Sequence, residues 1–353
     1  MMCFFYSVLH MFVDGVCAYA MFGTYVLQEN GNFYLLLYNF CAFALQMPIG
    51  ALFDIFAVKM KQAGWDIPFA AVAAGVLLTL TGAVTHPAVL GIGNALFHVG
   101  GGLGTIREDM LSGWHGRRLG VFVAPGALGL FAGTWMAKYR LGTGVIAMAG
   151  SVMFCLYGVL FCVKKYVVLR PVKQFAYQRQ KSAASGSGRF CLAVCCFIVV
   201  ILRSYIGLAV AFPWKTTALY GGAAVLAVTA GKVAGGFFAA RYGCPKTALL
   251  SLAFAAACYW YSPICAVGLM ALFLFNMTMP MTLYLLVGAF HPMGGFAFGL
   301  LTFALFLGYL PVYFGWKLCI GGTAIGCAGS ILSLLLLRFG MRKGGRDGFY
   351  FPD

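Results

Sequence analysis

The stretch KKYVVLRPVKQFAYQRQKSAASGSGR, residues 164–189, separates two long apolar halves of a chain of 353 residues. Seven of its residues are Lys or Arg, and it ends in Ser-Ala-Ala-Ser-Gly-Ser-Gly before Arg189, the composition of a flexible linker. Six apolar runs precede it and six follow it, most of them close to the 20 or so residues that span a bilayer. The stretch therefore predicts two six-helix halves joined by a basic loop.

The composition places the whole chain in a membrane. It is 62% hydrophobic and 9% charged, with a mean hydropathy of +0.92, whereas soluble domains carry about 25% charged residues. The runs are continuous, unlike the alternating segments of about ten residues in a β-barrel, so we expect an all-α polytopic protein. The predicted spans are residues 3–27, 33–56, 67–85, 88–106, 119–137, 142–163, 190–212, 218–240, 247–261, 264–288, 294–315 and 318–338. The run 247–261 is short for a span, which leaves eleven helices as an alternative.

The distribution of basic residues predicts the orientation. The formal charge is +16, and 18 of the 24 Lys and Arg residues fall in loops on the side that holds both termini, against four on the opposite side. Cytoplasmic loops carry such an excess, so both termini are expected in the cytoplasm, and a nucleic-acid partner is not expected. We interpret the chain as a monomeric, multi-pass protein of a bacterial plasma (inner) membrane. Its predicted parts are a bundle at 1–163, a linker at 164–189, a bundle at 190–340 and a tail at 341–353.

The rare polar residues inside the spans carry most of the functional information, because a charge at mid-bilayer costs about 2.5 to 3.5 kcal/mol. Six of the eight strongly polar ones fall in the first, fourth, seventh and tenth spans, which predicts that these four helices surround a cavity. The six are His10, Asp14, Asn94, His98, Arg203 and Asn276, with Ser204, Thr278 and Thr282 on the same spans; the other two are Gln46 and Lys232. Interhelical hydrogen bonding without any transport role is the alternative for each of them.

Asp14 is the one acid deep within a predicted span, and His10 lies four residues before it on the same helical face. Histidine titrates near neutral pH, so we hypothesise that Asp14 and His10 take up and release a coupling proton. Arg203 and Lys232 are the two bases inside spans and are candidates for binding an anion, and pairing with Asp14 across the cavity is the alternative for Arg203. The 13 cysteines lack paired spacing and are interpreted as buried thiols, so no metal site is expected.

Several strings resemble the major facilitator superfamily, in particular its fosmidomycin-resistance-like branch. The first span carries His10-Met-Phe-Val-Asp14-Gly15, with Val13 in place of the branch's usual Asn. The fourth span carries Gly93-Asn94-Ala-Leu-Phe-His98 followed by Gly100-Gly101-Gly102, and the seventh carries Leu202-Arg203-Ser204. The resemblance implies the major facilitator fold of twelve helices in two pseudo-symmetric bundles, which alternate their access to a midplane site.

Two broader motifs of that superfamily are present in reduced form. Gly50-Ala-Leu-Phe-Asp54, followed by Lys59 and Lys61, is similar to its gating motif, whose Asp bonds to neighbouring helix ends. The second-half copy, Gly235 to Gly243, keeps Arg241 but has Ala240 at the acidic position. The fifth span, Gly120 to Gly129, resembles the antiporter motif with Ala124 and Leu128 at glycine positions. Close helix packing is the alternative explanation for these glycines.

The resemblance implies a proton-coupled secondary transporter that moves a small organic solute or drug, by efflux in exchange for protons. The incomplete motif of the fifth span leaves open a symporter that imports a small anionic metabolite. A membrane-embedded enzyme or an inactive transporter-like scaffold are further alternatives, although no HExxH helix and no P-loop occur in the sequence. No cofactor is expected beyond the proton gradient as energy source, and the expected partners are the solute and the lipid bilayer.

Overall fold

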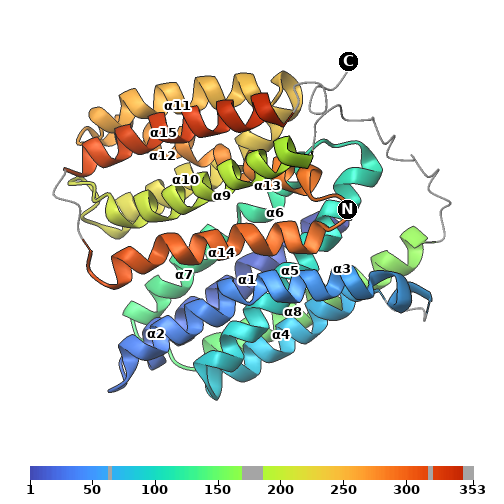
Figure 1. Ribbon diagram of the computed structural model, residues 1–353. Helices are drawn as coiled ribbons and strands as arrows, with labels where there is room; N and C mark the ends of the chain where they lie inside the picture. Colours follow the sequence, from blue (N-terminus) through green and yellow to red (C-terminus); the bar gives the residue numbers. More distant parts are fainter. Residues whose placement is uncertain (63–65, 169–185, 317–320, 345–353) are drawn as a thin grey trace.

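The computed structural model describes residues 1–62, 66–168, 186–316 and 321–344, and every regular element within them is a helix (Figure 1). In the first half the elements are α1 (Met2–Ala20), the π-helical η1 (Met21–Tyr25), α2 (Gly31–Asn39), the π-helical η2 (Phe40–Ala44), α3 (Gln46–Gln62), α4 (Ile67–Val84), α5 (Pro87–Ser112), α6 (Arg117–Val123), α7 (Gly126–Lys138) and α8 (Gly144–Val168). In the second half they are α9 (Gly186–Ala209), α10 (Ala218–Tyr242), α11 (Cys244–Trp260), α12 (Cys265–Asn276), α13 (Thr278–Ala289), α14 (Gly294–Tyr313) and α15 (Gly322–Lys343).

These elements join into helices that match the predicted apolar runs. Eleven helices of the described chain are long and apolar enough to cross a membrane, some of them built from two or three elements, such as Met2–Tyr25 and Cys265–Ala289. The twelfth is α11, whose 17 residues rise about 25 Å, somewhat less than a hydrocarbon core of about 30 Å. The prediction of an all-helical membrane protein is confirmed, and the short ninth run is a helix.

The linker boundaries differ from the prediction. Helix α8 continues through Val168 and α9 begins at Gly186, so both ends of the predicted loop 164–189 are helical. The predicted tail also begins later, because α15 continues to Lys343. The remainder of the linker and of the tail lies outside the described residues.

The two halves lie side by side, with α14 placed between the first half and the rest of the second (Figure 1). We call the end of the molecule that holds Met1 and Lys343 the inner end and the opposite one the outer end. The halves contact each other through α3 and α14, and through α6 and α10. At the first contact the backbones touch, since a Cβ on Gly50 would overlap the carbonyl of Gly295.

Within the first half, α1 packs tightly against α7. A Cβ on Gly129 would overlap the carbonyl oxygen of Met11, and one on Gly133 would overlap that of Gly15. The small residues therefore allow the two backbones to touch, as is common between membrane helices. This contact fixes the position of the polar face of α1 against the break that separates α6 from α7.

Candidate functional site

A cavity of about 540 Å³ lies between the two halves. Its wall is mainly aromatic and aliphatic, with Phe22 and Phe43 from the first half and Phe212, Phe275 and Phe306 from the second. At the outer end it reaches Lys215, which is exposed. Its volume falls in the range of small-molecule sites, about 300 to 1,000 Å³.

Five of the predicted site residues line this cavity, namely Asp14, Arg203, Ser204, Lys232 and Asn276. Thr278 and Thr282 do not line it. Both are fully buried, and their hydroxyls donate to carbonyls of their own helix segment, Thr278 to Phe275 O at 2.7 Å and Thr282 to Thr278 O at 3.0 Å. Ser and Thr hydroxyls inside membrane helices commonly donate a hydrogen bond to a carbonyl of the preceding turn.

His10, Asp14 and His98 form a compact group that we call the His–Asp triad. The two Nε2 atoms of the histidines are 2.8 Å apart. His10 Nε2 lies 3.1 Å from Asp14 Oδ2, and His98 Nε2 lies 3.6 Å from Asp14 Oδ1. The histidines are 5% and 8% exposed, whereas the Asp14 side chain is 21% exposed and reaches the cavity. The triad therefore stands in the cavity wall with its carboxylate outermost.

The backbone determines which histidine nitrogens carry protons. His10 Nδ1 lies 2.7 Å from Phe122 O, and His98 Nδ1 lies 2.8 Å from Asn94 O. A carbonyl oxygen only accepts, so both Nδ1 atoms donate, and in the neutral rings both Nε2 atoms present lone pairs. Two lone pairs 2.8 Å apart beside a carboxylate repel one another. A single proton between the rings turns this contact into an N–H···N hydrogen bond and balances the charge of Asp14.

Asn94 completes this group. Its Nδ2 donates to Asp14 Oδ1 at 3.0 Å and approaches Cys17 Sγ at 3.5 Å, so Asn94 is a partner of the carboxylate and does not line the cavity. One ligand atom from each member of the triad lies within 4.8 Å of the other two, a spacing that a metal ion also accommodates. No metal was expected from the sequence, because that expectation considered the cysteines and because His98 lies far along the chain from His10 and Asp14. The absence of a metal stays a prediction.

A break in the fifth helix supplies two backbone acceptors that sequence reasoning missed. Pro125 has no N–H and interrupts the helix. In an α-helix Ala127 N would donate to Val123 O, but here it donates to Ala124 O, so Val123 O lacks its usual helical donor. Lys232, on α10 of the second half, donates from Nζ to Val123 O at 3.2 Å. His10 donates to the preceding carbonyl, that of Phe122. Pro125 within an apolar run was the available signal, because a proline frees carbonyls in the turn before it.

Arg203 lines the cavity without forming an ion pair with Asp14 among the described residues, although the sequence suggested that the two pair. Its side chain is 6% exposed, and Nη1 has no hydrogen-bond acceptor in the described part of the chain. Tyr309 of α14, which the sequence did not single out, also lines the cavity with a buried hydroxyl that has no partner there. Ser204 is already engaged, donating to Leu305 O at 2.7 Å.

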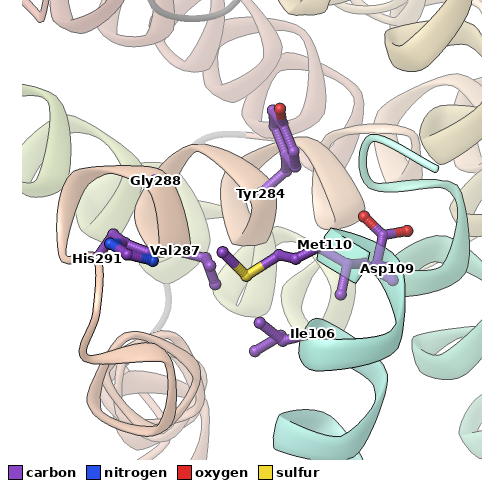
Figure 2. A pocket seen from close by; sticks show the side chains of 8 residues that line it. Ile106, Asp109, Met110, Tyr284, Val287, Gly288 and His291 are labelled. Carbon is purple, nitrogen blue, oxygen red and sulfur yellow. The ribbon is translucent and has the colours of Figure 1, made fainter. Parts of the chain in front are cut away.

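The inner end is closed across the halves. Asp54 of α3 accepts from Gly295 N at 3.0 Å and from Phe296 N at 2.7 Å, two of the unpaired amides at the start of α14. Nearby a small pocket of about 40 Å³ lies between α5 and α13, with Met110 and Asp109 facing Val287 and Tyr284 (Figure 2). Lys59 and Arg241, predicted with the gate, are exposed. The cavity is therefore accessible from the outer end.

Replacing Asp54 by Asn is expected to loosen this closure, because two bonds to a carboxylate are weakened and each is worth about 1.5 to 3 kcal/mol. In a cysteine-free background with one cysteine at Val287, the rate of maleimide labelling from the inner side should rise at least about tenfold, since each 1.4 kcal/mol is a factor of ten. Glu108→Gln is the matched control, because Glu108 pairs with Arg118 and the N-terminus in its own half. An unchanged labelling rate would show that Asp54 does not hold the gate.

The architecture is the major facilitator fold. The chain superposes on the E. coli fucose:proton symporter FucP with a TM-score of 0.57 and 11% identity, over 97% of this chain and 98% of that one. It superposes on the human organic anion transporter MFSD10 with a TM-score of 0.60 and 14% identity, over 96% and 98% of the two chains. For a bacterial homologue of the iron transporter ferroportin in the outward-facing state, the TM-score is 0.54 and the identity 15%, over 97% and 100%.

Identities this low establish the fold alone. No family model matches the chain, and no curated protein matches its sequence. The likeness to the fosmidomycin-resistance-like branch thus remains a resemblance of short motifs.

Proposed function

We propose that the protein is a proton-coupled secondary transporter that moves a small organic solute across a membrane by alternating access. The observation that carries this proposal is the position of the His–Asp triad in the wall of a cavity between two helical halves. Three acceptors converge there, and a proton relieves their repulsion. The shared fold with a fucose:proton symporter and an organic anion transporter supports the same conclusion.

The closed inner end and the accessible outer end correspond to the outward-facing state of such a cycle. With both termini in the cytoplasm, as the basic loops predict, the cavity opens away from the cytoplasm. Opening the inner end requires α14 to leave Asp54 and α10 to move along α6. The proposed gate consists of Gly50 and Asp54, with Lys59 and Arg241 at the adjoining helix ends.

Two modes of coupling are proposed. Efflux of a solute in exchange for protons is the first, and import of an anionic solute together with protons is the second. The second is favoured by one observation, namely that Arg203 and Lys232 both face the cavity. The two modes differ in whether solute and proton move in opposite directions or in the same one.

The test is flux in proteoliposomes that contain the purified protein and a pH-sensitive dye. With a pH gradient imposed, a panel of aromatic carboxylates, phosphonates, amines and neutral analogues is added and the internal pH is followed. At least one solute is expected to move protons, and an ionophore that collapses the gradient should stop its accumulation. Accumulation that is indifferent to the pH gradient, or driven by sodium, would contradict proton coupling, and the sign of the pH change separates exchange from cotransport.

A further inference from the structure

The charged groups of the cavity wall are unevenly divided between the two halves. The first half contributes Asp14, whose carboxylate is engaged by His10, His98 and Asn94. The second half contributes three bases, Arg203, Lys232 and Lys215. Among the described residues that line the cavity, Asp14 is the single acid, so the space beside the second half is positively charged.

Two hydrogen-bond donors on this side are buried and unused. Arg203 Nη1 has no acceptor in the described chain, and the Tyr309 hydroxyl has no partner there. A guanidinium that is 6% exposed loses most of its hydration, so an unused N–H on it is costly. Both residues flank one helix contact, where Gly308 of α14 packs against Ser204 of α9. Two donors and a positive charge are thus held close to one stretch of the cavity wall.

We propose that the substrate is an amphiphilic organic anion whose acidic group binds Arg203 and Tyr309. The acidic group accepts hydrogen bonds from the guanidinium and the phenol, which satisfies the two unused donors. The apolar body of the molecule lies against aromatic side chains such as Phe306 and Phe43 on either side of the cavity. Lys215 at the outer end and Lys232 deeper inside attract the anion along its path.

This assignment rests on the proposed transport function and selects between its two modes. The charged and titratable groups around the anion and the triad, besides Asp14, are His10, Cys17, Tyr38, His98, Arg203, Lys215, Lys232, Tyr259 and Tyr309. With its proton the triad is neutral, and without it the triad adds one negative charge to the wall that the anion faces. Anion and proton therefore favour each other's binding, and by linkage each raises the affinity for the other. Mutual enhancement is the condition for cotransport.

The experiment measures equilibrium binding to the purified full chain in detergent, without any proton gradient. The probes are 2-naphthoate, 2-naphthylphosphonate and 2-naphthalenesulfonate, with the neutral 2-naphthylmethanol and the cationic 2-naphthylmethylammonium as isosteric controls. At least one acid is expected to bind at least about tenfold more tightly than the alcohol and the amine, because a charge-assisted bond is made to a desolvated guanidinium. Equal binding of the alcohol, or tighter binding of the amine, would overturn the proposal.

Three variants locate the site. Arg203→Gln should weaken binding of the acid at least about tenfold. Arg189→Gln, on the same helix but exposed at its inner end, should leave binding unchanged. Tyr309→Phe removes a hydroxyl that has no partner in the described chain, so it should weaken acid binding while leaving the melting temperature of the ligand-free protein equal or higher. If both Arg203→Gln and Tyr309→Phe bound the acid with the affinity of the native protein, the assignment of the anion site to these two residues would be wrong.

The failure of this inference and the failure of the proposed function are distinguishable. Selective acid binding without proton-dependent flux refutes the transporter and retains the anion site. Proton-dependent flux of a cationic or neutral solute, without acid binding, retains the transporter and refutes the anion site. Entry of the acid together with protons into the proteoliposomes supports both the transport function and the anion site. Movement of the acid and the protons in opposite directions refutes the mutual enhancement of their binding.

Discussion

Replacing Asp14 by Asn is expected to reduce solute movement driven by a pH gradient to the level of protein-free liposomes. Asn has nearly the same shape and accepts from Asn94 Nδ2 as Asp14 does, but it carries no charge to stabilise a proton on the histidines. The two imidazoles then remain neutral through the cycle. Exchange of labelled for unlabelled solute without a gradient should persist, because it does not require a change in proton load. Both rates are measured on the same preparation.

Asp66→Asn is the matched control for this variant. Asp66 is an acid of the same half that pairs with Lys164 and Arg107 away from the cavity. Its side chain is 38% exposed, so the loss of its charge costs little stability. The solute flux of the Asp66→Asn variant should equal that of the native protein. If Asp14→Asn retained gradient-driven transport, the proton would have to be carried elsewhere and the role of the triad would be wrong.

Replacing Gly126 by Ala is expected to dismantle the triad without changing any of its members. A Cβ at this position would overlap both His10 Nε2 and Asp14 Oδ2, so at least one of these two side chains must shift, which disturbs the contact of His10 with His98 or that of Asp14 with the histidines. Overpacking of this kind costs about 1 to 3 kcal/mol. The variant should melt at a lower temperature in detergent and should lose gradient-driven transport, as Asp14→Asn does.

Gly158→Ala provides the comparison, because Gly158 is helical and nothing in the described chain lies within 4 Å of the position of an added Cβ. Alanine there relieves the entropic cost of a helical glycine, about 0.5 to 1 kcal/mol, so the melting temperature should stay equal or rise. If Gly126→Ala resembled Gly158→Ala in both stability and flux, the space beside His10 would not be needed by the triad.

Much of the fold can be predicted from the sequence, because a chain can cross a bilayer only as helices or as a closed β-barrel. The continuous apolar runs predicted the helices, and even the short run at 247–261 is helix α11. The helix ends were less readable. The Gly and Ser residues after 181 suggested a linker, whereas α9 begins at Gly186, since packing of α9 against α15 outweighs the low helix propensity of glycine.

The site was predictable in part, and the residues show why. The spacing of four within His10–Asp14 and Asn94–His98 indicated shared helix faces, and the structure brings these four side chains together. Thr278 and Thr282 looked equally polar, but a hydroxyl can bond to its own helix and then needs no cavity. Tyr309 looked like one aromatic among many, because only its position against α9 reveals a buried hydroxyl without a partner in the described chain.

The turn before Pro125 has a consequence for the proposed transport cycle. Its consecutive carbonyls, Phe122 O and Val123 O, bind His10 from the first half and Lys232 from the second. In that cycle, a movement of α10 along α6 would break the contact of Lys232 with Val123 O, one peptide away from the carbonyl that holds His10. The histidine of the first half and a helix of the second half are therefore separated by a single backbone linkage.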